Sequence, residues 1–270
     1  MTFANFDFSL RACHICSSES GKSDGTSPQV AELPSDFYEI VDNRGDRFRD
    51  AFTRTCLYLA NSHMDDTSVG TTVVVVGTEY GNLEAMLRFQ RQALAGDKTI
   101  SAQQFPHATT SSASTFINMS KNVTGGNVTL NAGTFTSITA LLHTFLHLQS
   151  NPTGGGHLFV GDTYCEEAMD DVIKRTCLSR RITPGVCYAW LTGGGHFNAE
   201  IAFGDRSFEL CGTEHSRIYR ESEPSEQNGA FALHWLMSSA ITLVQGESVS
   251  LGIEVADRRA AISITRQLAA

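Results

Sequence analysis

The hydrophobic and polar positions along the chain predict an alternation of strands and helices. The strongest signal is the segment 71–82, TTVVVVGTEYGN. Its unbroken run of valines predicts a strand that is buried on both faces, as in the middle of a parallel sheet. The segment 8–16, FSLRACHIC, predicts an earlier strand, and apolar residues at helical spacing predict helices over 49–63 and 83–95. The Ser/Gly/Pro-rich segment 17–37 predicts a polar loop.

A second series of elements follows in the middle of the chain. The Thr- and Ser-rich segment 101–123 predicts a helix, although small hydroxyl residues have a low helix propensity. Such residues are tolerable where a helix lines a cavity or a close subunit contact, so we expect this helix at one of these places. The pattern then predicts strands over 127–131 and 157–162, with helices over 134–150 and 166–178. Alternating strands and helices indicate the α/β class.

The pattern changes after residue 182. The segment 185–212 predicts two strands around a glycine turn and a third strand, added antiparallel to the edge of the sheet. An amphipathic helix is predicted over 231–244. The alternating segments 249–256 and 260–267 predict two final strands.

Two similar glycine-rich segments raise the question of phosphate binding. They are PTGGGHLFVGD at 152–162 and LTGGGHFNAEIAFGD at 191–205. Neither has the spacing of a phosphate-binding loop, and each run of glycines precedes a strand instead of a helix N-terminus. We therefore interpret both as flexible turns.

Composition and charge narrow the functional classes. Hydrophobic residues make up 41% of the 270 positions and charged residues 18%, as in ordinary globular proteins. The net charge of −9 argues against nucleic acid or an anionic membrane surface as a partner. No window approaches 18 apolar residues, the N-terminus lacks the pattern of a signal peptide, and the seven cysteines have no regular spacing. These features predict a cytoplasmic protein with reduced thiols and no membrane span.

The segment 125–148, GGNVTLNAGTFTSITALLHTFLHL, has the layout of a catalytic elbow. A short β-branched strand leads through a tight turn into a helix whose first turn holds Thr134. A cysteine at such a place becomes a reactive thiolate, because the helix N-terminus stabilises its negative charge. A threonine hydroxyl is far harder to ionise and needs an adjacent base. The layout therefore predicts a nucleophile turn without its nucleophile.

Three segments together resemble the N-terminal half of the β-ketoacyl synthases. They are VVVVGTEYGNLEAMLRFQRQAL, the stretch from ISAQQFPHATTSSASTF through the elbow to LLHTFLHL, and HLFVGDTYCEEAM. The resemblance covers roughly residues 70–172. It implies a thiolase-like α/β fold with a mixed sheet flanked by helices. It also implies one ketosynthase-like domain over 1–270, in which 1–182 form the N-terminal half and 183–270 a shortened C-terminal part.

The same resemblance implies that the condensing chemistry is absent. Thr134 aligns with the active cysteine of the family, and a slip of one residue would place Gly133 there instead. The two histidine motifs of the family's second half are not found. The segment CGTEHS at 211–216 contains glycine, threonine and histidine, but not in the order of either motif. The chain looks most like the shortened chain length factors of aryl-polyene and type II polyketide systems. These are non-condensing subunits that pair with an active ketosynthase.

This resemblance carries over to particular residues. A complete ketosynthase is the implied partner, with the acyl carrier protein as an indirect one, and no cofactor or metal is implied. Half of a thiolase fold is also expected to expose a sheet edge and an apolar face, which need covering. The residues implied at the partner interface are Val128, Thr129, Leu130 and Asn131. Those implied to line the acyl tunnel are Thr109, Thr110, Phe116, Thr134 and Phe135, the first three on the pocket helix.

Two rival functions remain open. In the first, the chain is an acyltransferase or thioesterase that uses Thr134 or Cys165 on an acyl carrier thioester. Against it, Thr134 also fits a helix cap, and the acidic neighbours of Cys165 predict a raised thiol pKa. In the second, the chain is a homodimeric acyl-binding scaffold without chemistry of its own.

Three further groups have a structural explanation that is preferred over a functional one. Cys13 and Cys16 form a lone CxxC without the second ligand pair that zinc requires. His143 and His147 share a helix face without an acidic partner nearby in sequence, which favours ordinary packing. The helix macrodipole accounts for an acidic cluster at the start of the predicted helix 166–178, namely Glu166, Glu167, Asp170 and Asp171.

Overall fold

The structure is a computed structural model of the chain, and it describes residues 2–17, 33–64, 71–96, 100–123, 125–176, 182–205, 215–220 and 228–268. The strands are β1 (Thr2–Ser17), β2 (Val73–Gly77), β3 (Asn127–Leu130), β4 (Gly155–Asp162), β5 (Gly185–Asp205), β6 (His215–Arg220), β7 (Ser248–Val255) and β8 (Arg258–Arg266). The helices are α1 (Phe37–Ile40), α2 (Ala51–His63), α3 (Leu83–Leu94), α4 (Ser112–Ser120), α5 (Thr136–Ser150), α6 (Glu166–Thr176) and α7 (Gly229–Thr242). Two 3-10 helices are η1 (Asp46–Phe48) and η2 (Ala102–His107).

The strands form one hydrogen-bonded sheet in the order β3-β2-β4-β5-β8-β7-β6, with β1 paired to β5. The valine run lies in β2, which is parallel to β3 on one side and to β4 on the other and is buried at every position. This confirms the prediction of a central parallel strand. The C-terminal part adds antiparallel strands beside β4, as predicted.

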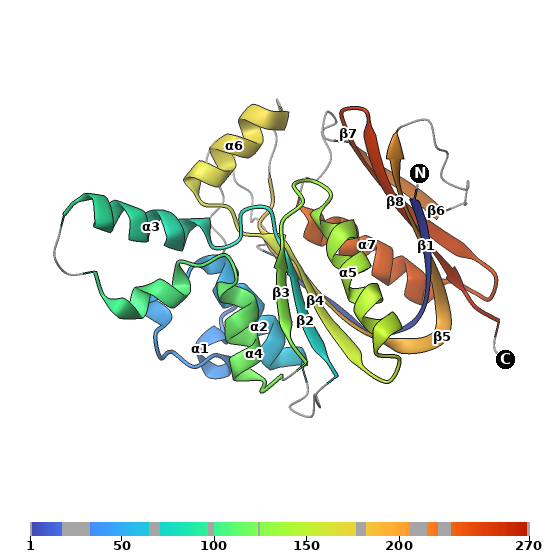
Figure 1. Cartoon of the computed structure of the whole chain (residues 1–270), viewed down its shortest axis with the longest axis horizontal. Coiled ribbons are helices and arrows are strands. Elements are labelled where there is room, and N and C mark those ends of the chain that lie inside the picture. The colour runs from blue at the N-terminus through green and yellow to red at the C-terminus, as the bar shows by residue number, and fades with distance from the viewer. Residues whose placement is uncertain are drawn as a thin grey trace.

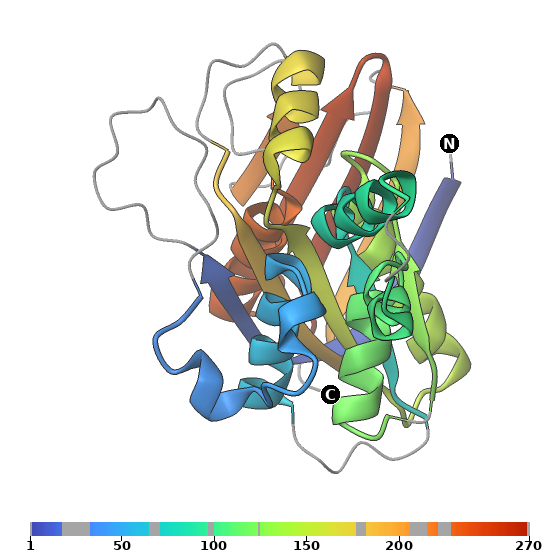
Figure 2. The same ribbon diagram turned by 90° about the vertical axis from the view of Figure 1, so that its left-hand side faces the viewer.

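The long strand β5 divides the sheet into two parts. Residues 185–192 pair with β4, whereas residues 197–205 pair with β8. Between the two parts lie α5 and α7, which share one hydrophobic core with side chains from β2, β4, β7 and β8 (Figure 1). A second core lies between the outer face of the first part and the helices α2 and α4 (Figure 2). The elbow therefore lies at the N-terminal end of α5, a helix that packs against side chains from both parts of the sheet.

The first glycine-rich segment begins with a turn at 152–153, as predicted, but the later glycines of both segments lie within strands. Gly155 and Gly156 lie within β4, and Gly193 to Gly195 lie within β5, so the predicted turn between two strands is wrong. A Cβ atom on Gly193 would lie 2.0 Å from the carbonyl oxygen of Pro152, and one on Gly156 would lie 2.4 Å from Cγ2 of Thr144. Gly156 and Gly193 are needed because neighbouring chain segments pack directly on them. The predicted third strand, over 206–212, lies outside the described residues.

Several boundaries differ from the predicted ones. β1 begins six residues earlier than the predicted start at residue 8, because its N-terminal half pairs with the second half of β5. The predicted helix over 101–123 is two elements, η2 and α4, separated by a turn at 108–111. The predicted loop over 17–37 falls largely outside the described residues.

The outer face of the second part of the sheet is polar. Val249, Leu251 and Ile253 of β7 point into the central core, so the alternate residues of the strand face outward. Those residues bond across the strands: Ser248 contacts Thr265, Ser250 donates to Ser263, and Glu254 pairs with Arg220 and Arg259. Apart from a small buried cluster of Ala202 and Ala261, the described residues of this face that bond across the strands are polar, so they do not form the exposed apolar face that was expected.

A buried histidine in β4 predicts a pH dependence of stability. His157 is 3% exposed, and its Nδ1 lies 2.9 Å from the hydroxyl of Tyr188. Burial, and to a lesser extent the charge of Lys121, lowers the pKa of His157 from 6.5 to about 4. Between these pH values the unfolded chain binds a proton that the folded chain does not, so stability is lost as the pH falls through this window.

We expect the wild type to lose about 3 kcal/mol more stability than His157→Asn between pH 7 and pH 4, since one pKa unit corresponds to about 1.4 kcal/mol. Urea unfolding at a series of pH values measures the difference. His196→Asn, at an exposed position of β5, serves as the control and should follow the wild-type curve. Parallel curves for wild type and His157→Asn would contradict the prediction.

Candidate functional site

The elbow between β3 and α5 is formed by a left-handed glycine and a threonine. Gly133 has a φ of +55°, a conformation that glycine adopts without strain. The Thr136 hydroxyl accepts a hydrogen bond from the Ala132 N–H at 2.9 Å and donates to the carbonyl of Gly133 at 2.6 Å. α5 begins at Thr136, two residues later than predicted. Thr134 is thus neither in the first turn nor the cap of the helix.

Thr134 faces an arginine that the sequence pattern did not connect with the elbow. Nη1 of Arg175, in the last turn of α6, lies 3.4 Å from the Thr134 hydroxyl. The same guanidinium forms an ion pair of 2.9 Å with Glu79, which follows β2. Arginine is only a hydrogen-bond donor, so this contact cannot remove a proton from Thr134.

The cavity at the elbow is very small. Its volume is about 10 Å³, close to the minimum that a single water molecule requires. α5 is seated tightly on β2, because a Cβ atom on Gly77 would lie 2.7 Å from the Cβ of Ala140. The lining residues are Gly77, Glu79, Gly133, Thr134, Thr136, Ser137, Val160, Gly161, Asp162 and Gly229. An acyl chain does not fit into this space.

A buried carboxylate lines the cavity. Asp162, at the end of β4, is 4% exposed. It accepts hydrogen bonds from the Thr78 hydroxyl at 2.5 Å and from the N–H groups of Tyr80, Glu79 and Gly81 at 2.8, 3.3 and 3.3 Å. Burial raises the pKa of Asp162 to about 7, and these donors counteract part of that rise. Asp162 therefore ties the end of β4 to the turn after β2.

Sequence patterns missed Asp162 as a site residue, although one signal was present. It ends the strand 157–162, and the turn 78–81 follows a second strand that is predicted to be buried. The carboxyl ends of parallel strands meet at one edge of a sheet, so these two signals together could have placed a polar residue of 157–162 against the turn.

Cys165 is half-buried just before α6. Burial is the main cause that raises the pKa of its thiol, and Glu167 raises it further. A thiol with a raised pKa is a poor nucleophile at neutral pH. In the acidic cluster at the start of α6, Glu167 pairs with Arg91, and Asp171 accepts a hydrogen bond from the Tyr80 hydroxyl at 2.8 Å.

The structure separates the predicted tunnel residues. Thr109 and Thr110 lie in the turn before α4 and not on the helix, so this part of the prediction is wrong. Phe116 stacks on His107 with ring centroids 4.6 Å apart, and Phe135 packs against the central core. Of the five predicted tunnel residues, only Thr134 lines the elbow cavity. Elsewhere on α4 the Ser114 hydroxyl lies 2.9 Å from that of Thr129, which holds α4 against β3.

The strand predicted at the partner interface is an edge of the sheet. Within the described part of the chain, β3 pairs with β2 alone. Val128, Thr129 and Leu130 are half-buried. Asn131 lies beyond the strand, where its side chain donates to the carbonyl of Glu79 at 2.6 Å and accepts from the Gly133 N–H at 3.0 Å. Asn131 therefore fixes the turn of the elbow.

The remaining candidates are the CxxC pair and two histidines of α5, and the buried Nδ1 of His143 has no hydrogen-bond partner among the described residues. Cys13 and Cys16 are in β1, and Sγ of Cys13 lies 3.9 Å from that of Cys187. Nε2 of His147 lies 2.6 Å from the carbonyl oxygen of Thr71. Over the described ranges, no three or more histidine, cysteine or acidic residues are grouped as metal ligands would be. Over the same ranges, the helices are too short or too polar to cross a bilayer.

No protein-family profile and no curated protein matches this sequence. Solved structures do match its fold. The ishigamide ketosynthase/chain length factor has a TM-score of 0.68 at 13% identity, with 88% of this chain and 86% of that chain covered. A chain of the Xenorhabdus doucetiae complex of the ketosynthase ApeO with its chain length factor ApeC has a TM-score of 0.61 at 13% identity, covering 96% and 99%. A β-ketoacyl synthase from Burkholderia phymatum has a TM-score of 0.60 at 10% identity, covering 87% and 86%. The likeness confirms the predicted fold class: this chain has the thiolase-like α/β fold of ketosynthases and chain length factors.

Proposed function

We propose that this chain is a non-condensing subunit, similar to a chain length factor, that pairs with an active β-ketoacyl synthase in polyketide, aryl polyene or fatty acid-type biosynthesis. The observation that carries the proposal is the elbow at 131–136, which keeps the geometry of a nucleophile turn without a thiol. In the complex, the partner holds the nucleophile and binds the acyl carrier protein. This chain shapes the partner's acyl tunnel.

Three features of the elbow support the absence of condensing chemistry. By the sequence resemblance, Thr134 aligns with the active cysteine of the ketosynthases. The Arg175 guanidinium beside it donates hydrogen bonds and cannot act as a base. The cavity of about 10 Å³ has no room for an acyl chain. The small cavity opposes binding of the acyl chain, and the missing thiol and the guanidinium oppose the chemical step.

Two features support a partner at the β3 edge. An edge strand presents unpaired backbone N–H and C=O groups, which favour the addition of another strand. Beside it, α3 and the segment around η2 project from the body of the molecule (Figure 1). Leu94 and Phe105 in this projection are 78% and 62% exposed. One of the matched structures is itself a complex of a ketosynthase with its chain length factor.

On this proposal, Val128, Thr129 and Leu130 form the interface strand, with Asn131 at its end. Phe116, with Thr109 and Thr110 in the turn before α4, faces the tunnel of the partner. Bulky side chains at that end limit how long the acyl chain can grow.

Co-expression with a ketosynthase from the same gene cluster tests the pairing. We expect the two chains to co-purify and to elute as a one-to-one complex in size-exclusion chromatography with light scattering. A monomer that binds none of the ketosynthases of its gene cluster would contradict the proposal. A stable self-dimer that is unchanged by added ketosynthase would support the homodimeric scaffold instead.

Intact-mass measurement tests the absence of acyl transfer. We expect no covalent adduct on this chain after incubation with an acylated carrier protein, because the guanidinium beside Thr134 only donates hydrogen bonds and the pKa of the Cys165 thiol is raised. An adduct that disappears in Thr134→Ala or Cys165→Ala would show an acyltransferase or thioesterase. The active ketosynthase, incubated in the same way, is the positive control.

A further inference from the structure

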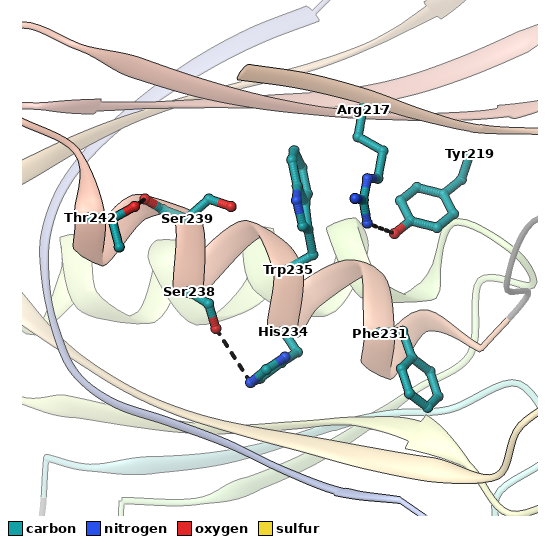
Figure 3. Close-up of a pocket in the computed structure, with 8 residues that line it drawn as sticks. All are labelled: Arg217, Tyr219, Phe231, His234, Trp235, Ser238, Ser239 and Thr242. Carbon is teal, nitrogen blue, oxygen red and sulfur yellow. Dashed lines mark hydrogen bonds between the residues drawn. The ribbon is translucent and has the colours of Figure 1, made fainter. Parts of the chain in front are cut away.

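A second cavity lies between the edge strand β6 and the helix α7. Its volume is about 600 Å³, which is within the range of small-molecule sites. Figure 3 shows Arg217 and Tyr219 reaching from β6 toward Trp235 of α7. Phe231 lines one end of the cavity, and Ser239 and Thr242 line the other. The walls are thus aromatic, with hydroxyl groups and one guanidinium.

The guanidinium of Arg217 is held in place but is not neutralised. It lies 4.6 Å from the centre of the Trp235 ring, and one of its N–H groups donates to the Tyr219 hydroxyl at 3.1 Å. Over the described residues no carboxylate lies within ion-pair distance of Arg217, whereas Arg54, Arg220 and Arg259 all pair with acids. A guanidinium has five N–H donors, so most of those of Arg217 are available to a ligand.

The cavity is also lined by a histidine, His234, whose surroundings favour the neutral form. Burial, and to a lesser extent the charge of His14, lowers the pKa of His234 below 6.5. Its Nε2 lies 3.3 Å from the Ser238 hydroxyl, on the side of α7 away from Arg217 (Figure 3). Arg217 is therefore the positive charge that a ligand in this cavity meets.

We propose that this cavity binds a small molecule in which a carboxylate is attached to an apolar body. The carboxylate accepts from the free N–H groups of Arg217, and the apolar body packs against Trp235 and Phe231. A phosphate dianion fits less well, because a single cation faces it and the cavity follows α7 toward its C-terminal end, where the macrodipole is negative. The proposal is independent of the pairing with a ketosynthase.

Benzoate is the first probe, titrated into the full chain or into its complex with a co-expressed partner by isothermal titration calorimetry. We expect a Kd of about 1 mM or below. Uncharged benzamide should bind at least about tenfold more weakly, since it cannot form the charge-assisted hydrogen bonds that a carboxylate forms with Arg217. Octanoate distinguishes an alkyl acid from an aryl acid, and tighter binding of either one supports the site.

Variants locate the binding. Arg217→Gln should weaken benzoate binding at least about tenfold. Arg258→Gln, at an exposed position of β8, should leave it unchanged. Equal affinities for benzoate and benzamide, no saturable benzoate binding, tighter binding of inorganic phosphate, or equal effects of the two variants would each overturn the proposal. The benzoate and benzamide comparison needs no variant, so it stands even if Arg217→Gln fails to fold.

Discussion

Replacing Thr129 by proline is expected to weaken the proposed complex with a ketosynthase by at least about 100-fold. Thr129 lies in the middle of β3, the edge strand that the proposed function assigns to the interface. The carbonyls of Gly126 and Leu130 accept from β2 at 3.1 and 3.0 Å. Backbone groups alternate in direction along a strand, so those of Thr129 point to the open edge. Proline removes that N–H and leaves the bonds to β2 in place.

Size-exclusion chromatography and surface plasmon resonance with the purified ketosynthase measure this effect. Thr129→Val is the matched control, because it keeps a β-branched side chain and the backbone N–H but loses the contact with the Ser114 hydroxyl. We expect this control to bind within about threefold of the wild type, since one partly exposed hydrogen bond contributes little. Equal loss in both variants would place the effect in the packing of α4, and undiminished binding of Thr129→Pro would exclude β3 from the interface.

The elements that the sequence predicts well are those that depend on local patterns. Four consecutive valines can be accommodated only where both faces of a strand are buried, and β2 is such a strand. The turn around Gly133 follows from its position between a β-branched strand and a long helix. Its φ of +55° agrees with that reading.

The elements that the sequence predicts poorly depend on distant neighbours. A run of glycines has the same letters in a flexible turn and in a tightly packed strand. Only the approach of Pro152 to Gly193 decides between the two. Likewise, Arg175 is 41 residues from Thr134, and no pattern connects them until α6 is placed above the elbow. Chemistry that depends on such contacts needs the three-dimensional structure.

The largest loss of stability from a change at the elbow is expected for Asp162→Ala. This substitution leaves the Thr78 hydroxyl and the N–H groups of Glu79 and Tyr80 without their acceptor, whereas the Gly81 N–H keeps its bond of 2.7 Å to the Thr78 hydroxyl. An unsatisfied buried donor costs about 1–3 kcal/mol, and partial entry of water reduces the sum, so we expect a loss of about 4 kcal/mol. Urea unfolding measures it, and the expected shift is well above the uncertainty of the extrapolation.

Two further variants separate the hydrogen bonds from the rest of the effect. Asp162→Asn keeps the shape and one acceptor oxygen, so it should cost about 2 kcal/mol, roughly half of the loss in Asp162→Ala. Asp171→Ala removes an exposed carboxylate with one hydrogen bond to Tyr80 and should cost less than about 1 kcal/mol. If Asp162→Ala is as stable as Asp171→Ala, the carboxylate does not tie β4 to the turn after β2. The expected loss of stability decreases from Asp162→Ala to Asp162→Asn to Asp171→Ala, because the number of buried donors that lose their acceptor decreases in this order.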